Sequence, residues 1–334
     1  PKVRTLAAFF HEACPELLQH REPHRPPPPR PAHVHDVWQM DAKELIRLAD
    51  GEIATVLDVR EPCACCFLGA FVHTVQTQKS WRKLSRREIQ DDLRCVFTEY
   101  GLPCAIQTDR EVVYGRPPVE AFPTLLTLWL VGLGVEHRFK RPNHVTDQAA
   151  VERGHKTLFD WIATPQPPAD AQTLQADLDQ ARWMHNTVLP SQAGDCRGCP
   201  PETIHPEVNV PLRPYAPSAE LELFDLQRVD SFLARFVWPH KASQVGQVTV
   251  GSGLYYVGVA FAGQTVDVRF DPIDRHLTFH DAQDGHLLRR QPVKGLDTAD
   301  ITGLEVPPPS AGQPIQLSFP WWGYACSAQQ GVRH

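Results

Sequence analysis

Residues 36–44 read D-V-W-Q-M-D-A-K-E, and this stretch decides the fold of the chain. Apolar Trp38, Met40 and Ala42 alternate with polar residues, and this period of two predicts a β-strand. Asp41 stands in the middle of that strand. A carboxylate on a strand fit for burial is costly unless it has a partner or a metal ion. The strand therefore predicts a charged site whose other members come from elsewhere in the chain.

Two later stretches supply further carboxylates. C-A-I-Q-T-D-R ends a second apolar strand at Asp109, and T-D-Q-A-A-V-E-R-G-H-K opens a helix that carries Glu152. Carboxylates are the hard oxygen ligands that Mg²⁺ prefers. Each acid also has an ordinary interpretation: Asp41 or Asp109 belongs to a turn, and Glu152 is an exposed helix residue. Two other acids compete for the site, Asp58 near the end of the next strand and Asp147 at the start of the helix.

Asp, Asp and Glu in this order, on strand, strand and helix, resemble the acidic triad of the integrase core found in bacterial insertion-sequence transposases and retroviral integrases. W-Q-M-D resembles the first strand of that family, W-Q-x-D, and Q-T-D-R resembles its T-D-N-G. Residues 141–158 read R-P-N-H-V-T-D-Q-A-A-V-E-R-G-H-K-T-L and are similar to the family's R-P-x-x-P-x-x-N-x-x-V-E-R-x-H-R-T-L. The resemblance covers residues 37–162, with a weaker echo at 185–190.

The resemblance implies a DDE-type transposase or integrase, which cuts DNA at the ends of an insertion element and joins the strand to target DNA. It implies Asp41, Asp109 and Glu152 as catalytic residues and ligands of two Mg²⁺ or Mn²⁺ ions per active site. In that arrangement Asp41 bridges both ions. Asp58 falls at a non-catalytic position, and Asp147 caps the helix. Two metal ions neutralise the charge that develops in phosphoryl transfer.

Basic residues near the triad are the expected DNA contacts. Lys156 and His155 follow Glu152 by about one helical turn and share its face, so Lys156 is expected to meet a phosphate of the DNA end. The alternative for Lys156 is a Glu–Lys pair along the helix. The run 137–144 is expected to face phosphate, whereas the run 79–87 fits a solvated face equally well. The predicted DNA-binding residues are Lys156, His155, Arg153, Lys43, Arg141 and Arg110.

Two departures from the family pattern bear on activity. The gap between Asp109 and Glu152 is longer than the family's commonest spacing, and the surplus falls in residues 111–122, an expected loop insertion. T-D-R-E replaces T-D-N-G, which puts Arg110 in the active-site loop. These features and the net charge of −6 favour an alternative, a catalytically impaired DNA-binding or assembly protein. Another alternative is an RNase H-like nuclease that cuts without joining.

The order of elements predicts five structured or linking parts. Residues 33–188 follow the pattern β-β-β-α-β-α-β-α, which favours an α/β, RNase H-like core with a mixed five-stranded sheet flanked by helices. Residues 189–225 are a Pro-rich linker that few contacts are expected to cross. Residues 226–305 hold short alternating runs and tight turns, as in a small SH3-like all-β barrel. Residues 1–32 are expected as a helix and Pro-rich linker, and residues 306–334 as an extended tail.

The expected limits of the elements follow from periodicity and breakers. In the core the expected strands are 36–44, 53–59, 65–72, 103–108 and 135–139, and the expected helices are 86–100, 119–134, 147–164 and 174–187. The expected strands of the barrel are 233–238, 248–250, 254–259, 265–270, 276–280 and 287–290.

The composition is that of a globular protein, with 42% apolar and 22% charged residues. The longest uncharged run, 121–135, is shorter than the ~20 residues of a membrane span. Nine cysteines and no visible secretion signal favour reduced thiols in a cytosol. We expect a cytoplasmic bacterial protein, nucleoid-associated on double-stranded DNA, with no membrane partner. The family's mechanism implies a homo-oligomer, at least a dimer on DNA.

One C-x-x-C pair, Cys196 and Cys199, lies in a Pro- and Gly-containing loop with His205 nearby. A zinc site needs two more ligands, and no second C-x-x-C follows. An accidental pair in a loop is therefore favoured over a metal site.

Overall fold

The structure is a computed structural model of the chain, and it describes residues 31–76, 82–141, 149–162 and 166–306. The side chains of Glu44, His155, Trp161 and residues 149–153 are outside this description. So are the expected N-terminal helix, the Pro-rich linker up to residue 30, the C-terminal tail from residue 307 and the expected helix cap Asp147.

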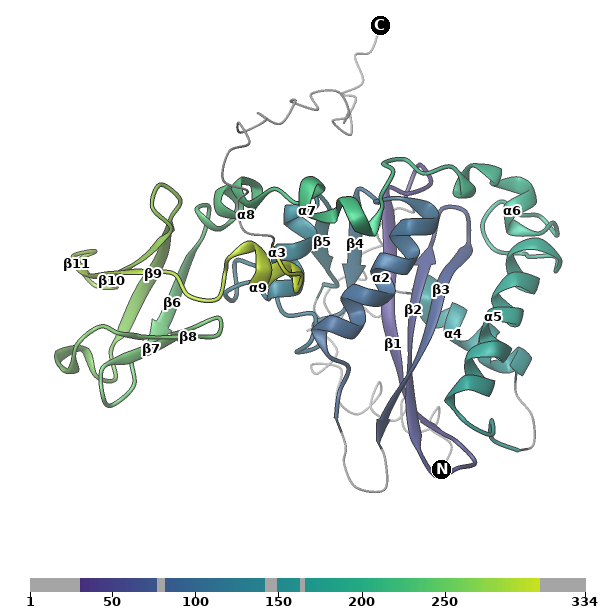
Figure 1. Cartoon of the computed structure of the whole chain (residues 1–334), viewed down its shortest axis with the longest axis horizontal. Coiled ribbons are helices and arrows are strands. Elements are labelled where there is room, and N and C mark those ends of the chain that lie inside the picture. The colour runs from purple at the N-terminus through teal and green to yellow at the C-terminus, as the bar shows by residue number, and fades with distance from the viewer. Residues whose placement is uncertain (1–30, 77–81, 142–148, 163–165, 307–334) are drawn as a thin grey trace, which may run out of the picture.

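The core is built on a five-stranded sheet (Figure 1), which lies in the strand order β3-β2-β1-β4-β5. Strand β2 pairs antiparallel with both of its neighbours, whereas β1, β4 and β5 pair in parallel. This order, with one antiparallel strand, is that of the RNase H-like fold, and the predicted fold class is confirmed. The strands are β1 (Val37–Arg47), β2 (Ile53–Glu61), β3 (Cys66–Gln76), β4 (Ala105–Thr108) and β5 (Glu136–Phe139).

Helices cover both faces of the sheet. Helices α2 (Arg86–Tyr100) and α3 (Leu125–Gly132) pack on one face, and α4 (Ala149–Ile162) packs on the other beside α5 (Ala171–Thr187). Alternation along the strands causes this division. Trp38, Met40, Leu57 and Val59 belong to the apolar core of α2 and α3, whereas Ala54 and Val56 pack with Leu158 of α4.

The limits of α2 and α3 show where local signals suffice. Helix α2 has both predicted ends: Ser85 and Glu88 form a capping box at its start, and Gly101, with a positive φ, follows its last residue. Helix α3 begins later than the predicted residue 119, because Thr124 is its N-cap and accepts a bond from the backbone N–H of Thr127. The residues before Thr124 belong to the insertion instead. No helix within the described ranges has both the length and the apolar character of a membrane span.

Helix α5 covers the open edge of β3. Gln175, Arg182 and Asn186 form hydrogen bonds with backbone groups of residues 67–72, the positions that a further strand would occupy. An unpaired strand edge is a template for association with another chain. The expected closing helix is thus confirmed, and it also protects the sheet.

The Pro-rich connector packs on the core, so the expectation of few contacts across it is wrong. Glu220, in the short helix α7 (Glu220–Leu223), is fully buried. Its carboxylate accepts hydrogen bonds from Arg94 of α2 at 2.7 and 2.9 Å, from Trp129 of α3 at 2.8 Å and from the hydroxyl of Tyr215. Prolines restrict the backbone without preventing tertiary packing. The predicted domain limits, 189 and 225 among them, stay a prediction.

The C-terminal part of the described chain is all-β and lies beside α3 (Figure 1). We call residues 237–292 the β-unit. Four of its strands form an antiparallel sheet in the order β11-β10-β9-β6, and β7 pairs with β8 as a hairpin. The strands are β6 (Val237–Lys241), β7 (Gln247–Val250), β8 (Gly253–Tyr256), β9 (Thr265–Asp271), β10 (His276–Asp281) and β11 (Leu287–Pro292).

Side chains near the end of β11 and just after it join the hairpin to the sheet. Gln291 and Lys294 donate hydrogen bonds to the backbone oxygens of Tyr256 and Leu254 on β8. The expected all-β sheet region is therefore confirmed, and its closure into a small SH3-like barrel stays a prediction. The expected strand 233–238 is wrong at its start, because helix α8 (Leu226–Leu233), capped by Asp225, precedes β6.

Candidate active site

The register of the sheet brings Asp41 and Asp109 together. Strands β1 and β4 pair in parallel up to Gln39 and Gln107, whose side-chain amides share a hydrogen bond of 3.2 Å. Asp41 and Asp109 each lie two residues further along. Because side chains alternate between the faces of a strand, the Asp41 carboxylate lies on the face of the two amides, and Asp109 is the first residue after the end of β4. Both acids are partly exposed.

Helix α4 covers that same face. Asp41 lies directly opposite Asp58 in the antiparallel pairing of β1 with β2, and Arg60 follows Asp58 on the same face. A Cβ atom added to Gly154 of α4 would lie 2.2 Å from Nη1 of Arg60. Glu152 precedes Gly154 by two residues in α4, and its side chain lies outside the described residues. The structure thus places the backbone positions of two predicted acids at the same end of neighbouring strands, and the helix of the third covers the sheet face of Asp41.

Gly154→Ala is expected to lower the free energy of unfolding by about 1–3 kcal/mol, the usual effect of overpacking. The new methyl would also lie 2.8 Å from the ring of Phe67, over which the Arg60 guanidinium packs at 4.4 Å. Helix propensity alone favours Ala over Gly by about 1 kcal/mol. Urea denaturation measures the net change, and Ala176→Gly on the exposed side of α5 measures propensity alone. A more stable Gly154→Ala variant would contradict the close approach of α4.

Asp58 is the rival acid, and it differs from Asp41 in exposure. Its side chain is fully buried, although it shares the face of Asp41. Full burial separates the Asp58 carboxylate from hydrated ions and from DNA. This agrees with the non-catalytic position that the resemblance implies for it.

A series of hydrogen bonds holds the backbone at Asp109. Its Oδ1 accepts from the N–H of Glu111 at 2.8 Å, which makes an Asx turn, so the expected turn is present. The Thr108 hydroxyl donates to the Asp109 carbonyl at 2.9 Å, and its Oγ1 lies 3.0 Å from Nε2 of His137. Nδ1 of His137 lies 2.9 Å from the Thr127 hydroxyl. Because Thr108 gives its proton to Asp109, Nε2 of His137 is the donor and Thr127 donates to Nδ1.

His137 is a buried support of the site, which the sequence did not indicate. It opens the run 137–144 that was expected to face phosphate, and for this residue that expectation is wrong. Burial lowers the pKa of His137 to about 3, so the ring is neutral at physiological pH. Residues 142–144 of the same run lie outside the described residues.

Two of the predicted DNA-binding residues form ion pairs with acids of the same chain. Exposed Lys156 pairs with Asp160, one turn further along α4, at 2.7 Å. Arg110 bonds both carboxylate oxygens of Glu120, at 2.8 and 2.9 Å, and the backbone oxygen of Lys140. Contacts to DNA stay a prediction for all six residues, Lys156, His155, Arg153, Lys43, Arg141 and Arg110.

The donor set suits a hard metal ion. Asp41 and Asp109 offer carboxylate oxygens, the ligands that Mg²⁺ and Mn²⁺ take. Among the described residues no group of three or more His, Cys, Asp or Glu side chains is placed to hold a metal. The third acid of the expected site, Glu152, has its side chain outside that set.

His205, the further candidate ligand near the C-x-x-C pair, is bonded to other side chains. Cys196 is buried, Cys199 is partly exposed, and both are free thiols. The two ring nitrogens of His205 lie 3.0 Å from Glu207 and 2.9 Å from Asp195. Hydrogen bonds to these two carboxylates outweigh burial and raise the pKa of His205. The imidazole is therefore held as an ion-pair partner, which disfavours it as a zinc ligand.

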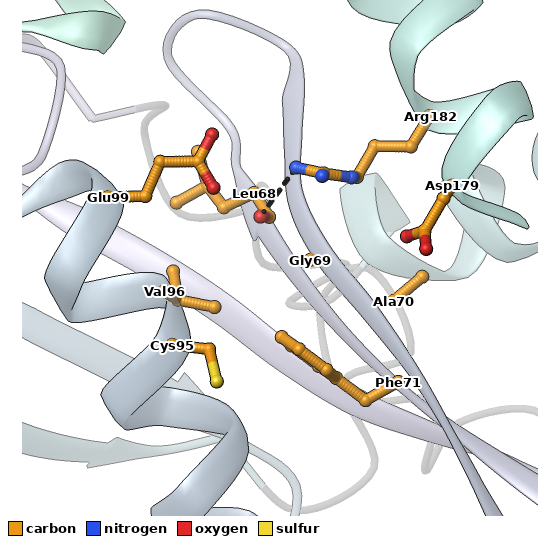
Figure 2. Close-up of a pocket in the computed structure, with 9 residues that line it drawn as sticks. All are labelled: Leu68, Gly69, Ala70, Phe71, Cys95, Val96, Glu99, Asp179 and Arg182. Carbon is orange, nitrogen blue, oxygen red and sulfur yellow. Dashed lines mark hydrogen bonds between the residues drawn. The ribbon is translucent and has the colours of Figure 1, made fainter. Parts of the chain in front are cut away.

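A cavity of about 80 Å³ lies at the β3 edge, between α2 and α5 (Figure 2). Residues 68–71 of β3 form its floor, with Val96 of α2 and Arg182 of α5 beside it. The acids lie at the junction of β1 with β4, in the middle of the sheet. This cavity is therefore separate from the candidate active site.

No model of a known protein family matches the chain. Among solved structures, the chain is similar to the catalytic core domain of BIV integrase, with 20% identity, a TM-score of 0.35 and coverage of 52% of this chain and 95% of that one. A chain of the simian T-cell lymphotropic virus intasome, solved with PP2A regulatory subunit B56 gamma, is 14% identical, with a TM-score of 0.42 and coverage of 83% and 82%. The HTLV-2 integrase catalytic core domain, solved with magnesium, is 14% identical, with a TM-score of 0.37 and coverage of 53% and 99%. The strand order and directions of this chain, rather than these alignments, define its fold.

Proposed function

We propose that the chain is a DDE-type transposase or integrase, which uses divalent metal ions to cut DNA at the ends of an insertion element and to join the freed strand to target DNA. The observation that carries the proposal is the position of Asp41 on β1 beside the end of the parallel strand β4, where Asp109 follows, with the helix of Glu152 over the sheet face of Asp41. The motifs W-Q-M-D, Q-T-D-R and V-E-R-G-H-K stand at these three positions. Their spatial arrangement supports the triad that the resemblance implies.

Asp41, Asp109 and Glu152 are the proposed ligands of two Mg²⁺ or Mn²⁺ ions. Bound ions of this kind activate the attacking oxygen and stabilise the leaving oxygen of a phosphodiester. The chain's own part is positioning. The Asx turn and the Thr108–His137 contact fix the backbone of Asp109. A carboxylate held in place before the reaction loses less entropy on binding its ligand.

Basic side chains on α4 are proposed to orient the DNA end. Lys156 is fully on the surface and shares a helix face with Glu152. Its partner Asp160 is also exposed, and an exposed ion pair contributes little energy, so a phosphate can replace the carboxylate. The formal charge of −6 counts acids that bound metal ions would neutralise. We further propose action in the bacterial cytoplasm, and at least a dimer on DNA, because two element ends have to be joined.

A strand-transfer assay with the whole chain tests the proposal. The assay combines a labelled duplex bearing the end of the element that encodes the chain, a plasmid target and Mg²⁺ or Mn²⁺. We expect joined products that disappear with a chelator and in Asp109→Asn. Cutting without joining would instead indicate a plain nuclease. Binding with neither reaction, unchanged by Asp109→Asn, would indicate an assembly protein without catalysis.

A further inference from the structure

The β-unit packs against the insertion that follows Asp109. We call residues 111–122, which lead from the β4 end toward α3, the insertion loop. Trp238 of β6 is 1% exposed, and its indole N–H donates to the backbone oxygen of Pro118 at 2.8 Å. The Trp238 ring also meets the Phe122 ring nearly edge-on, with centroids 4.7 Å apart. Gly251, in the β7–β8 turn, faces the same ring, since a Cβ added there would lie 3.3 Å from Phe122.

The same loop is tied to Asp109 at its other end. Glu111 donates its backbone N–H to the Asp109 carboxylate at 2.8 Å. Arg110 bonds both carboxylate oxygens of Glu120, which lies between Pro118 and Phe122 in the sequence. Contacts made by the β-unit and contacts made beside Asp109 thus meet within a few residues. A shift of the Trp238 contact would be transmitted to the Asp109 turn through the Arg110–Glu120 pair.

We infer that the β-unit completes the proposed active site within the same chain, with Trp238 as a positioning residue that holds Asp109 through the insertion loop. The inference rests on the proposed function and adds to it a residue that holds the site in its geometry. The long gap between Asp109 and Glu152 then has a structural purpose. The insertion loop is the docking element of the β-unit rather than a sign of a degraded enzyme.

A purely structural Trp238 and a positioning Trp238 differ in what they change. If the role is structural, substitution of Trp238 lowers the free energy of global unfolding and leaves the Asp109 turn as protected from hydrogen exchange as the rest of the core. If the role is positioning, the substitution makes the Asp109 turn open locally, without global unfolding. Native-state hydrogen exchange separates the two, because the Glu111 amide is the one bonded to the Asp109 carboxylate.

Trp238→Phe keeps an aromatic ring and removes the N–H donor. We expect the Glu111 amide of the whole chain to exchange about tenfold faster in this variant, the scale of one net hydrogen bond. Tyr255→Phe is the matched control, because Tyr255 also lies in the β-unit and its hydroxyl accepts a bond from the backbone N–H of Lys294, at 2.9 Å. Equal exchange of Glu111 in Trp238→Phe and the unchanged chain would overturn the inference. So would equal acceleration in both variants.

Mn²⁺ binding, followed by electron paramagnetic resonance, separates this inference from the proposed function. We expect Asp109→Asn to abolish binding, Trp238→Phe to weaken it several-fold and Tyr255→Phe to leave it unchanged. Mn²⁺ binding that ignores Asp109→Asn would refute the proposed function, and the exchange result would still decide the role of Trp238. Asp109-dependent binding that is equal with and without Trp238→Phe would overturn the inference. Phe122→Leu, on the loop side of the same contact, is expected to reproduce both effects and serves if Trp238→Phe fails to fold.

Discussion

Asp41→Asn is expected to reduce metal-dependent strand joining by about 10³-fold or more, since the proposed two-metal reaction would lose one of its carboxylate ligands. Asparagine has the shape of aspartate and lacks its negative charge, so it removes the ionic ligand without leaving a cavity. Asp41 is partly exposed and lies opposite the buried Asp58. Removing one of two facing carboxylates relieves repulsion, so we expect no loss of stability in the absence of metal. The strand-transfer assay and urea denaturation, done on the same preparation, measure the two quantities.

Thermal unfolding with and without Mn²⁺ gives this prediction an independent measurement. A ligand at about 100 times its dissociation constant stabilises the folded state by about 2.7 kcal/mol. The unchanged chain should show that gain, and Asp41→Asn should lose it. Asp267→Asn is the matched control, because Asp267 is also a partly exposed acid on a strand, in β9 of the β-unit. Strand joining that survives Asp41→Asn would refute the assignment of the site.

The sequence predicted those parts of the fold whose signals are local. The alternation around Asp41 located β1, and helical periodicity located α2, whose start is fixed by a capping box of Ser85 with Glu88. Asp41 and Asp109 each follow the last paired residues of β1 and β4, Gln39 and Gln107, by two positions. The strand positions could therefore be predicted from the sequence, and the roles of the acids stay a prediction.

The missed features are all tertiary. His137 looks like the start of a basic run, and only its place between Thr108 and Thr127 shows it to be neutral and buried. Trp238 was placed in a strand, but its partners in the insertion loop are more than a hundred residues away. Composition indicated a loose connector at residues 189–225, and it did not indicate that Glu220 would be enclosed by two helices of the core. Local patterns do not specify which distant groups meet.

Glu220→Ala is expected to lower the free energy of unfolding by about 3–5 kcal/mol, the usual effect of breaking a buried ion pair. The substitution removes the acceptor of Arg94, Trp129 and Tyr215 together. Arg94 is itself only 14% exposed, so its charge would be left largely buried. Arg94 also donates to the backbone oxygen of Thr302, so the loss reaches the helix that follows the β-unit, α9 (Thr298–Thr302).

The matched control is Glu136→Ala, which breaks the Arg138–Glu136 pair of 2.6 Å between side chains that are 47% and 61% exposed. An exposed pair of this kind contributes about 0–1 kcal/mol. Urea denaturation of both variants compares the loss of a buried ion pair with the loss of an exposed one. Replacing both Arg94 and Glu220 by Leu should recover much of the loss, because no buried charge then lacks a partner. A loss in Glu220→Ala no larger than that in Glu136→Ala would mean that the connector is not held by this network.

The network also predicts how stability depends on pH. Burial opposes ionisation of Glu220, but the hydrogen bonds from Arg94, Tyr215 and Trp129 outweigh it and hold the pKa of Glu220 below its usual value. A depressed pKa adds stability above the unfolded-state value of about 4.3, and this stability is lost as the pH falls through the lower pKa of the folded state. The difference in unfolding free energy between the unchanged chain and Glu220→Ala should therefore be largest near neutral pH and shrink in acid. A difference that stays constant from pH 7 down through the acid range would contradict an ionised Glu220 as the centre of the network.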